Sequence, residues 1–316
     1  MAGRPPAFRF LGVAFLKKRR GFHAFFYSQK AAPYVYVLPF ILVFLIFFVY
    51  PLISTVVMSF QNVLPGQVTF VGLENFIRLN DPEFFQAMKN NLIYTVLTLA
   101  LLIPFPMIFA CLLNNKHTIC RNFFRSALFV PILTSIVVAG TIFRLIFSEL
   151  PGALMNQIVG ALGLGPYRWR QMQGTVYAIL VLLACWRWTG VNILYFLSGL
   201  QSIPDELYES SSIDGASTIQ KFLHITWPML KPTTVYVLTI SIYGGFAMFL
   251  ESYMLYTNNR SPRGMGLTII GYLYRQGWEQ NNIGYGSAIG LCLLAIVMII
   301  NLIQLKFFGL FKREEG

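Results

Sequence analysis

The stretch "AAPYVYVLPFILVFLIFFVYPLISTVVM", residues 31–58, contains no Asp, Glu, Lys or Arg. A transmembrane helix needs about 20 mainly apolar residues to cross about 30 Å of hydrocarbon, and this stretch exceeds that length. Two further long gaps without charge lie between Lys89 and Lys116 and between Glu279 and Lys306. These gaps predict that the chain crosses a membrane several times.

The composition agrees with this interpretation. Apolar residues make up 56% of the chain, charged residues only 11%, and the mean hydropathy is +0.62, whereas soluble domains carry about 25% charged residues. We therefore predict an all-α, polytopic membrane protein in which residues 71–91 form short helices on the membrane surface before the second span. Six spans are expected, at 33–57, 92–115, 126–147, 174–199, 234–256 and 285–309.

The distribution of Lys and Arg predicts the orientation, because cytoplasmic loops carry the excess of basic residues. With both termini in the cytoplasm, the inner segments hold more than twice as many Lys and Arg residues as the outer ones. Residues 1–32 then form a cytoplasmic basic segment, 33–312 a six-helix transmembrane domain, and 200–233 a cytoplasmic loop. Since the net charge of +12 sits mainly beside spans, it indicates contact with the lipid bilayer and not with nucleic acid.

The loop 200–233 has the pattern of a helical hairpin. Pro204 followed by Asp205 and Glu206 is typical of a helix start, with acids near the positive end of the helix dipole. The helix is expected to end at Asp214-Gly215, where glycine accepts backbone angles that other residues resist and Asp214 caps the next helix.

A second helix would place four apolar residues on one face before two prolines end it. The apolar residues are Ala216, Ile219, Phe222 and Leu223, and the prolines are Pro228 and Pro232. Such a stripe either packs against the protein's own spans or is offered to a partner, and periodicity does not separate these alternatives.

The stretch "LQSIPDELYESSSIDGASTIQKFLHITWPMLKP", residues 200–232, resembles the cytoplasmic signature loop of the permease subunits of binding-protein-dependent ABC importers. The preceding "LSGLQSIPDELYE" is similar to the carbohydrate type of these permeases, which includes the maltose and glycerol-phosphate importers. Ser210 and Ser211 replace an alanine pair, and "TNNRSP", Thr257–Pro262, replaces the usual Thr-x-Gly-Gly-Pro. The matching residues are Glu209-Ser210-Ser211, Asp214-Gly215-Ala216, Phe222, Ile225, Pro228 and Pro232.

The resemblance implies the fold of a type I ABC importer permease in a bacterial or archaeal inner membrane. It further implies import of an oligosaccharide or other carbohydrate, with a second homologous permease, two ATP-binding subunits and an extracytoplasmic substrate-binding protein as partners. No cofactor is expected in this chain, because the partner ATPases bind ATP and Mg. The residues implied to couple to the ATPase are Glu209, Ser210, Ser211, Asp214, Gly215, Ala216 and Phe222.

Arg187 and Glu251 fall inside predicted spans four and five, where a lone charge costs at least about 2.5 kcal/mol. They either line a sugar pathway together with neighbouring polar and aromatic residues, or form a structural ion pair. Both interpretations stay open, and so does the function of the outer loop 257–284. The neighbouring residues are Asn192, Tyr195, Tyr243 and Tyr253, together with Trp186 and Trp188.

Catalytic patterns are absent from the sequence. His23, His117 and His224 lie in separate segments without metal-ligand spacing, and no phosphate-binding Gly-Lys loop occurs. We therefore expect a transport subunit and not an enzyme. A glycerol-phosphate or other small-solute permease and, less favoured, a secondary transporter remain as alternatives. The sequence leaves open whether a saccharide substrate is neutral or acidic and which permease subunit holds it.

Overall fold

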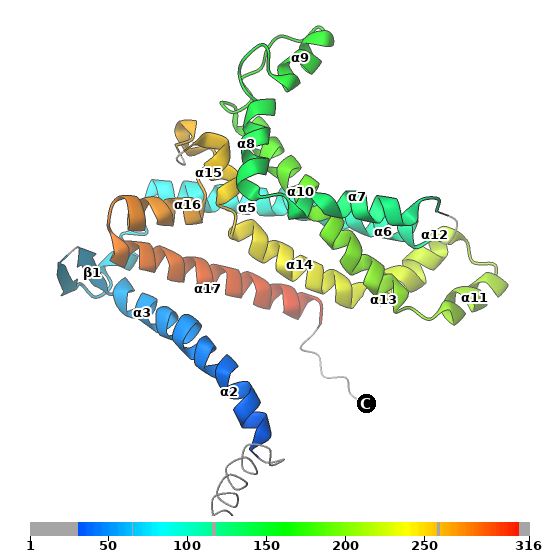
Figure 1. Ribbon diagram of the computed structural model, residues 1–316, viewed down its shortest axis with the longest axis horizontal. Helices are drawn as coiled ribbons and strands as arrows, with labels where there is room; N and C mark the ends of the chain where they lie inside the picture. Colours follow the sequence, from blue (N-terminus) through cyan, green and yellow to red (C-terminus); the bar gives the residue numbers. More distant parts are fainter. Residues whose placement is uncertain (1–30, 65, 116–117, 258–259, 310–316) are drawn as a thin grey trace, which may run out of the picture. The chain divides into compact units, whose positions relative to one another are not determined.

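The computed structural model describes residues 31–64, 66–115, 118–257 and 260–309 (Figure 1). The chain divides into two compact units, Met1–Val57 and Met58–Gly316. Most of the predicted cytoplasmic segment 1–32 therefore lies outside the described residues.

The first unit contains the first predicted span. Helix α2 (Ala32–Phe44), the π-helical turn η1 (Leu45–Val49) and α3 (Tyr50–Ser59) follow one another without a break from Ala32 to Ser59. The π-helical turn ends two residues before Pro51, which has no N–H to donate to a carbonyl of the preceding turn.

The second unit begins with an antiparallel hairpin of two strands, β1 (Gln61–Leu64) and β2 (Gln67–Phe70), with Gln61 opposite Phe70. The sequence did not predict these strands. The longer helices are α5 (Pro82–Leu102), α6 (Pro104–Asn114), α7 (Arg121–Leu133), α8 (Ile136–Ile146), α10 (Gln173–Gln201), α14 (Lys231–Phe246) and α17 (Ile283–Phe307). The shorter ones are α4 (Glu74–Ile77), α9 (Leu154–Ala161), α11 (Asp205–Ile213), α12 (Thr218–Lys221), η2 (Phe222–Thr226), α13 (Trp227–Met229), α15 (Leu250–Tyr256), η3 (Pro262–Gly264), α16 (Ile269–Tyr274) and η4 (Arg275–Glu279).

The predicted membrane architecture is confirmed for five spans. Helical segments long and apolar enough to cross a membrane are Ala32–Ser59, Pro82–Asn114, Gln173–Gln201, Lys231–Tyr256 and Ile283–Phe307. The second begins ten residues before its predicted start, because Asp81 caps the helix by accepting from the N–H of Glu83 at 2.7 Å and Pro82 opens its first turn. The prediction of separate surface helices was therefore wrong for residues 82–91.

The third predicted span, 126–147, is not a straight helix. Helices α7 and α8 meet at 94°, and the backbone at Thr134 and Ser135 is extended, with ψ of 134° and 133°. The bent pair counts as a sixth span only if its two halves cross the membrane together.

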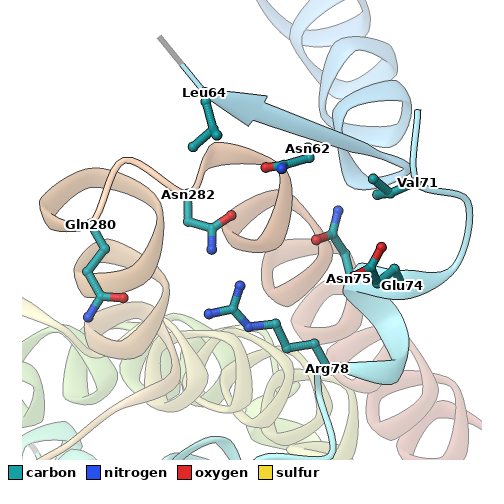
Figure 2. Close-up of a pocket in the computed structure, with 8 residues that line it drawn as sticks. All are labelled: Asn62, Leu64, Val71, Glu74, Asn75, Arg78, Gln280 and Asn282. Atoms are coloured by element: carbon teal, nitrogen blue, oxygen red, sulfur yellow. The ribbon is translucent and has the colours of Figure 1, made fainter. Parts of the chain in front are cut away.

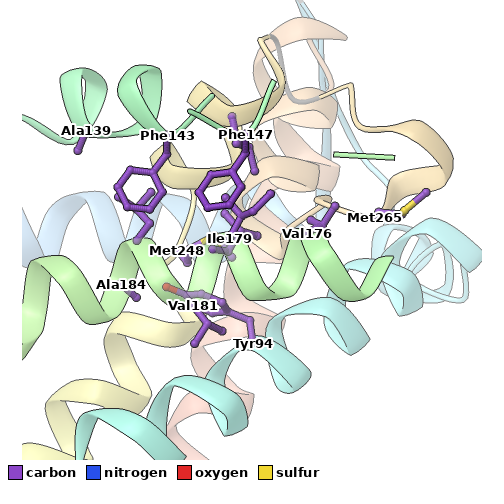
Figure 3. Close-up of a cluster of buried hydrophobic side chains, with 13 residues drawn as sticks. Tyr94, Ala139, Phe143, Phe147, Val176, Ile179, Val181, Ala184, Met248 and Met265 are labelled. Atoms are coloured by element: carbon purple, nitrogen blue, oxygen red, sulfur yellow. The ribbon is translucent and has the colours of Figure 1, made fainter. Parts of the chain in front are cut away.

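Helix α10 lies at the centre of the second unit, against α5, α6 and α7. One cluster of buried side chains joins α5, α8 and α10 to the segment after α14 (Figure 3), with Tyr94, Phe143, Ile179 and Met248 among its members. The backbones approach closely at Gly190, where an added Cβ would lie 2.0 Å from the carbonyl oxygen of Leu128. Small residues at such contacts let membrane helices pack tightly.

Candidate functional site

The hairpin 200–233 contains the turn that the sequence predicted. Gly215 has φ of +76°, and its N–H donates to the carbonyl of Ser212 at 3.2 Å, while the N–H of Ala216 donates to that of Ser211 at 2.9 Å. This pair of bonds is a Schellman motif, which ends α11 and satisfies its last carbonyls. The predicted role of glycine as the helix stop is confirmed.

The predicted cap of the second helix was wrong. Ser217, and not Asp214, caps α12: its hydroxyl accepts from the N–H of Gln220 at 3.3 Å, and the Gln220 side chain accepts from the N–H of Ser217 at 2.7 Å. Asp214 instead takes the C-cap position of α11. The capping box shifts the start of the second helix to Thr218 and leaves the Asp214 carboxyl on an exposed residue.

Side-chain bonds hold the two arms of the hairpin together. The Lys221 ammonium donates to the Ser212 hydroxyl at 2.6 Å, and the hydroxyls of Tyr208 and Thr226 lie 2.9 Å apart. Tyr208, Phe222 and Ile225 pack against a buried cluster formed by α6, α10 and Leu230. The hairpin is therefore fixed both internally and to the helices behind it.

The face that the hairpin leaves exposed differs from the predicted stripe. Phe222 is half-buried against its own core, whereas Ile213, Ile219 and Leu223 have exposed fractions of 88%, 72% and 54%. Beside them is an open pocket of about 350 Å³ lined by residues that include Ser211, Asp214, Gly215 and Ala216. Glu209 and Ser210 are exposed on α11. The exposed surface thus combines three apolar side chains with a turn that contains the acid Asp214 and the small residues Gly215 and Ala216.

A second pocket, of about 350 Å³, lies between α5, α10 and the α14–α15 segment. Four of the predicted pathway residues line it: Asn192, Tyr195, Tyr243 and Glu251. Trp188 also lines it, as do Tyr94, Thr98 and Ser241. The wall is mainly apolar and aromatic with a few polar groups, as in sites for small molecules.

Asn192 has a structural task besides lining this pocket. Its amide nitrogen donates to the carbonyl oxygen of Leu102 at 3.0 Å. In a continuous helix that carbonyl would accept from the N–H four residues later, but position 106 is a proline without one. Asn192 therefore satisfies a carbonyl that the break between α5 and α6 would leave unpaired in a buried place.

Three predicted residues are not in the pocket lining. Arg187 lies with its guanidinium carbon 6.0 Å from the Trp188 ring centroid, and its buried Nε has no hydrogen-bond partner. Tyr253 packs against Phe249 and Tyr274, and Trp186 against Phe143. Among the described residues Arg187 and Glu251 form no ion pair within 4.0 Å.

Span five is broken beside the pocket, and one amide holds the break. Helix α14 ends at Phe246 and α15 begins at Leu250. The Asn91 amide nitrogen donates to the carbonyl of Gly245 at 2.9 Å and lies 3.4 Å from that of Phe246, while its oxygen accepts from the N–H of Ile269 at 2.8 Å. Asn91 thus joins α5 to both α14 and α16.

The neighbouring residue Asn90 performs a similar task. Its nitrogen donates to the carbonyls of Gly264 and Leu267, both at 2.8 Å, and its oxygen accepts from the Tyr177 hydroxyl at 2.7 Å. The sequence interpretation missed both amides. The available signal is two adjacent amides directly before the apolar run that begins at Leu92.

The opposite end of the second unit from α11 (Figure 1) carries a polar cluster around the start of α5. The Tyr272 hydroxyl donates to Asp81 at 2.8 Å and lies 3.1 Å from that of Tyr285, and Arg275 pairs with Glu83 at 2.5 Å. Burial of Tyr272 raises the pKa of its hydroxyl, and its bond to Tyr285 adds to this. The hydroxyl therefore stays protonated and acts as a donor.

Next to this cluster is a polar pocket of about 260 Å³ between the β-hairpin, α4 and the start of α17 (Figure 2). Asn62, Asn282 and Gln280 line it, and Arg78 points into it with its guanidinium carbon 4.3 Å from the Tyr285 ring centroid.

Comparisons with known proteins agree with this geometry. Residues 90–307 match the family described as "Binding-protein-dependent transport system inner membrane component". The arabinooligosaccharides transport system permease protein AraP of Bacillus subtilis (strain 168) is 56% identical over 297 residues, covering 94% of this chain and 95% of that protein. The AraP protein of Halalkalibacterium halodurans is 49% identical, covering 95% and 94%.

Solved structures support the same fold. A chain in the crystal structure of a bacterial alginate ABC transporter in complex with an alginate pentasaccharide-bound periplasmic protein superposes with a TM-score of 0.80 at 23% identity. The match covers 90% of this chain and 96% of that one. At this identity the likeness establishes the fold.

Proposed function

The chain belongs to the family of binding-protein-dependent transport system inner membrane components, and from this premise we propose that it imports an arabino-oligosaccharide. Members of this family are non-catalytic transport subunits of ABC importers. The observation that carries the substrate proposal is 56% identity, over 94% of this chain, to a permease named for arabinooligosaccharides.

The proposed complex contains a second homologous permease, two ATP-binding subunits that hold ATP and Mg, and an extracytoplasmic binding protein. Both termini and the hairpin 200–233 are cytoplasmic in this proposal, because that orientation puts the larger share of Lys and Arg inside. The β-hairpin and the polar cluster around Tyr272 then face the binding protein.

The hairpin is proposed to seat in the ATPase. Its exposed apolar residues Ile213, Ile219 and Leu223 would be covered there, and the turn at Asp214-Gly215 brings backbone to the surface of the partner. Phe222 is proposed to connect the hairpin to the spans and not to contact the ATPase, because it packs on the core cluster that includes α6 and α10 residues. Closure of the ATPase dimer would thus move the hairpin and the spans as one body.

The pocket lined by Tyr195, Tyr243 and Glu251 is proposed as part of the substrate path. Aromatic faces suit the apolar faces of sugar rings, and Glu251 offers oxygen acceptors for hydroxyls. Asn192 lines the path as well, while one N–H of its amide is bonded to the carbonyl of Leu102. Arg187, whose guanidinium carbon lies 6.0 Å from the ring centroid of the lining residue Trp188, is proposed to support the wall together with Tyr253.

The test is uptake by proteoliposomes that contain the complete transporter. Labelled arabinotriose should accumulate only with internal ATP and external binding protein, and an ion gradient alone should drive none. Uptake driven by the gradient without ATP would identify a secondary transporter. Accumulation of sn-glycerol 3-phosphate in place of the trisaccharide would favour the glycerol-phosphate alternative, which a relative of 29% identity makes worth testing.

A further inference from the structure

The two ionisable residues of spans four and five relate differently to the pocket between α5, α10 and α14–α15. Glu251 lines it, whereas Arg187 does not. No Lys or Arg nitrogen lies within 4.0 Å of the Glu251 carboxyl in the part of the chain that the structure describes. The pocket wall therefore presents a carboxyl group that no cation covers.

We infer that Glu251 makes this pocket selective for neutral oligosaccharides over oligosaccharides that contain uronic acids, an inference that rests on the proposed function. A carboxylate offers acceptor oxygens only, and these match the hydroxyl donors of a neutral sugar. A uronate ring brings its own carboxylate, which repels Glu251 and has no proton to donate to it at neutral pH.

The remaining wall contains nothing that would neutralise a uronate. Its other polar side chains are hydroxyls, the indole of Trp188 and the amide of Asn192, and none of these carries a charge. Two like charges about 6 Å apart at an effective dielectric constant of about 20 weaken binding about a hundredfold. Salt and water in an open pocket reduce this effect, so we expect a discrimination of at least about tenfold.

Substitution of Gly244 gives an independent test of whether the sugar binds in this pocket. It lines the pocket, and a Cβ added there would meet no atom within 4 Å. The next residue, Gly245, lines the pocket too, but a Cβ there would lie 2.4 Å from the Thr95 hydroxyl. The Cβ of a residue substituted for Gly244 therefore takes space from the pocket without pressing on a neighbouring helix.

The experiment measures equilibrium binding of labelled arabinotriose and trigalacturonate to the complete transporter in nanodiscs, without the binding protein. Wild type, Glu251→Gln, Gly244→Val and Glu279→Gln are compared, the last being the same chemical change at an exposed residue outside the pocket. Wild type and Glu279→Gln should prefer arabinotriose by at least about tenfold, as the charge repulsion requires. Glu251→Gln should remove most of the preference by strengthening trigalacturonate binding, and Gly244→Val should weaken both.

Equal binding of the two sugars to wild type would overturn the inference, as would a preference that Glu251→Gln leaves unchanged or that Glu279→Gln changes as much. Failure of wild type to bind either sugar would also overturn it. The proposed function is judged separately by ATP-dependent uptake of arabinotriose with the same preparation and the binding protein. Uptake without Glu251-dependent discrimination therefore rejects the inference alone.

Discussion

The carbonyl oxygen of Gly245 accepts a hydrogen bond from the buried amide of Asn91 at 2.9 Å, although the two residues are 154 positions apart. The bond lies where α14 ends, so the broken span is held by a side chain of α5 and not by its own backbone. Within the hydrocarbon region each unpaired carbonyl is costly, and such breaks persist only where a neighbour supplies the missing donor.

Asn91→Ala is expected to destabilise the protein by about 3 kcal/mol or more, because it removes donors from two carbonyls and an acceptor from the N–H of Ile269. The measurement is the thermal midpoint of the purified complex. Asn80→Ala, at an exposed amide, is the control and should leave the midpoint unchanged. A midpoint equal to that of wild type in Asn91→Ala would show that the break does not need this amide.

The adjacent glycines of α14 give a matched pair. Gly245→Ala forces a methyl group against Thr95 and should cost about 1–3 kcal/mol by overpacking. Gly244→Ala adds the same methyl group to open space and should be within about 0.5 kcal/mol of wild type. Thermal midpoints of the two variants check this, and a similar loss in both would contradict the packing described.

Gly215→Val is expected to uncouple ATP hydrolysis from uptake while the chain still inserts. A β-branched residue at φ of +76° carries at least about 1–2 kcal/mol of backbone strain and opens the Schellman turn. Gly215→Asn is the control, because asparagine tolerates this region better. The measurement is the ratio of ATP hydrolysed to substrate imported, and normal coupling in Gly215→Val would count against the docking role.

Phe222 and Ile219 should respond differently to truncation. Phe222→Ala removes a side chain packed on the core cluster and should lower stability by about 2 kcal/mol. Ile219→Ala changes an exposed residue, so it should leave stability within about 0.5 kcal/mol and weaken retention of the ATPase subunits during purification. The reverse pattern would show that Phe222, and not Ile219, enters the ATPase.

The sequence was informative wherever a signal is local. Charge gaps located the spans, and a proline, two acids and a glycine located α11, since each acts on the backbone within one turn. The local signal for the bend between α7 and α8 is Pro131, which does not fix an angle of this size, since Thr134 and Ser135 occur in helices and in extended backbone alike. Aspartate favours N-cap positions, which predicts Asp214 as the cap of α12, but Ser217 forms a complete capping box with Gln220 and takes that position.

The sequence predicted which kinds of residue line the pocket, but not how those residues are arranged in space. Asn192, Tyr195, Tyr243 and Glu251 were predicted together and line one cavity. Arg187 was predicted with them but does not line this cavity, and no one-dimensional pattern decides which of several polar residues on a helix reaches a cavity. Asn90 and Asn91 were missed because the partners described above are 87–178 positions away.

Asn91 has a consequence for motion as well as for stability. Because one amide is bonded to the end of α14 and to the first turn of α16, the loop that follows the fifth span has no independent freedom at that point. A displacement of this loop would therefore shift the end of α14, where the span is broken. The end of α14 and Glu251 line the same pocket, so the pocket wall would move as well. A protein that binds this loop would thereby change the shape of the pocket without contacting it.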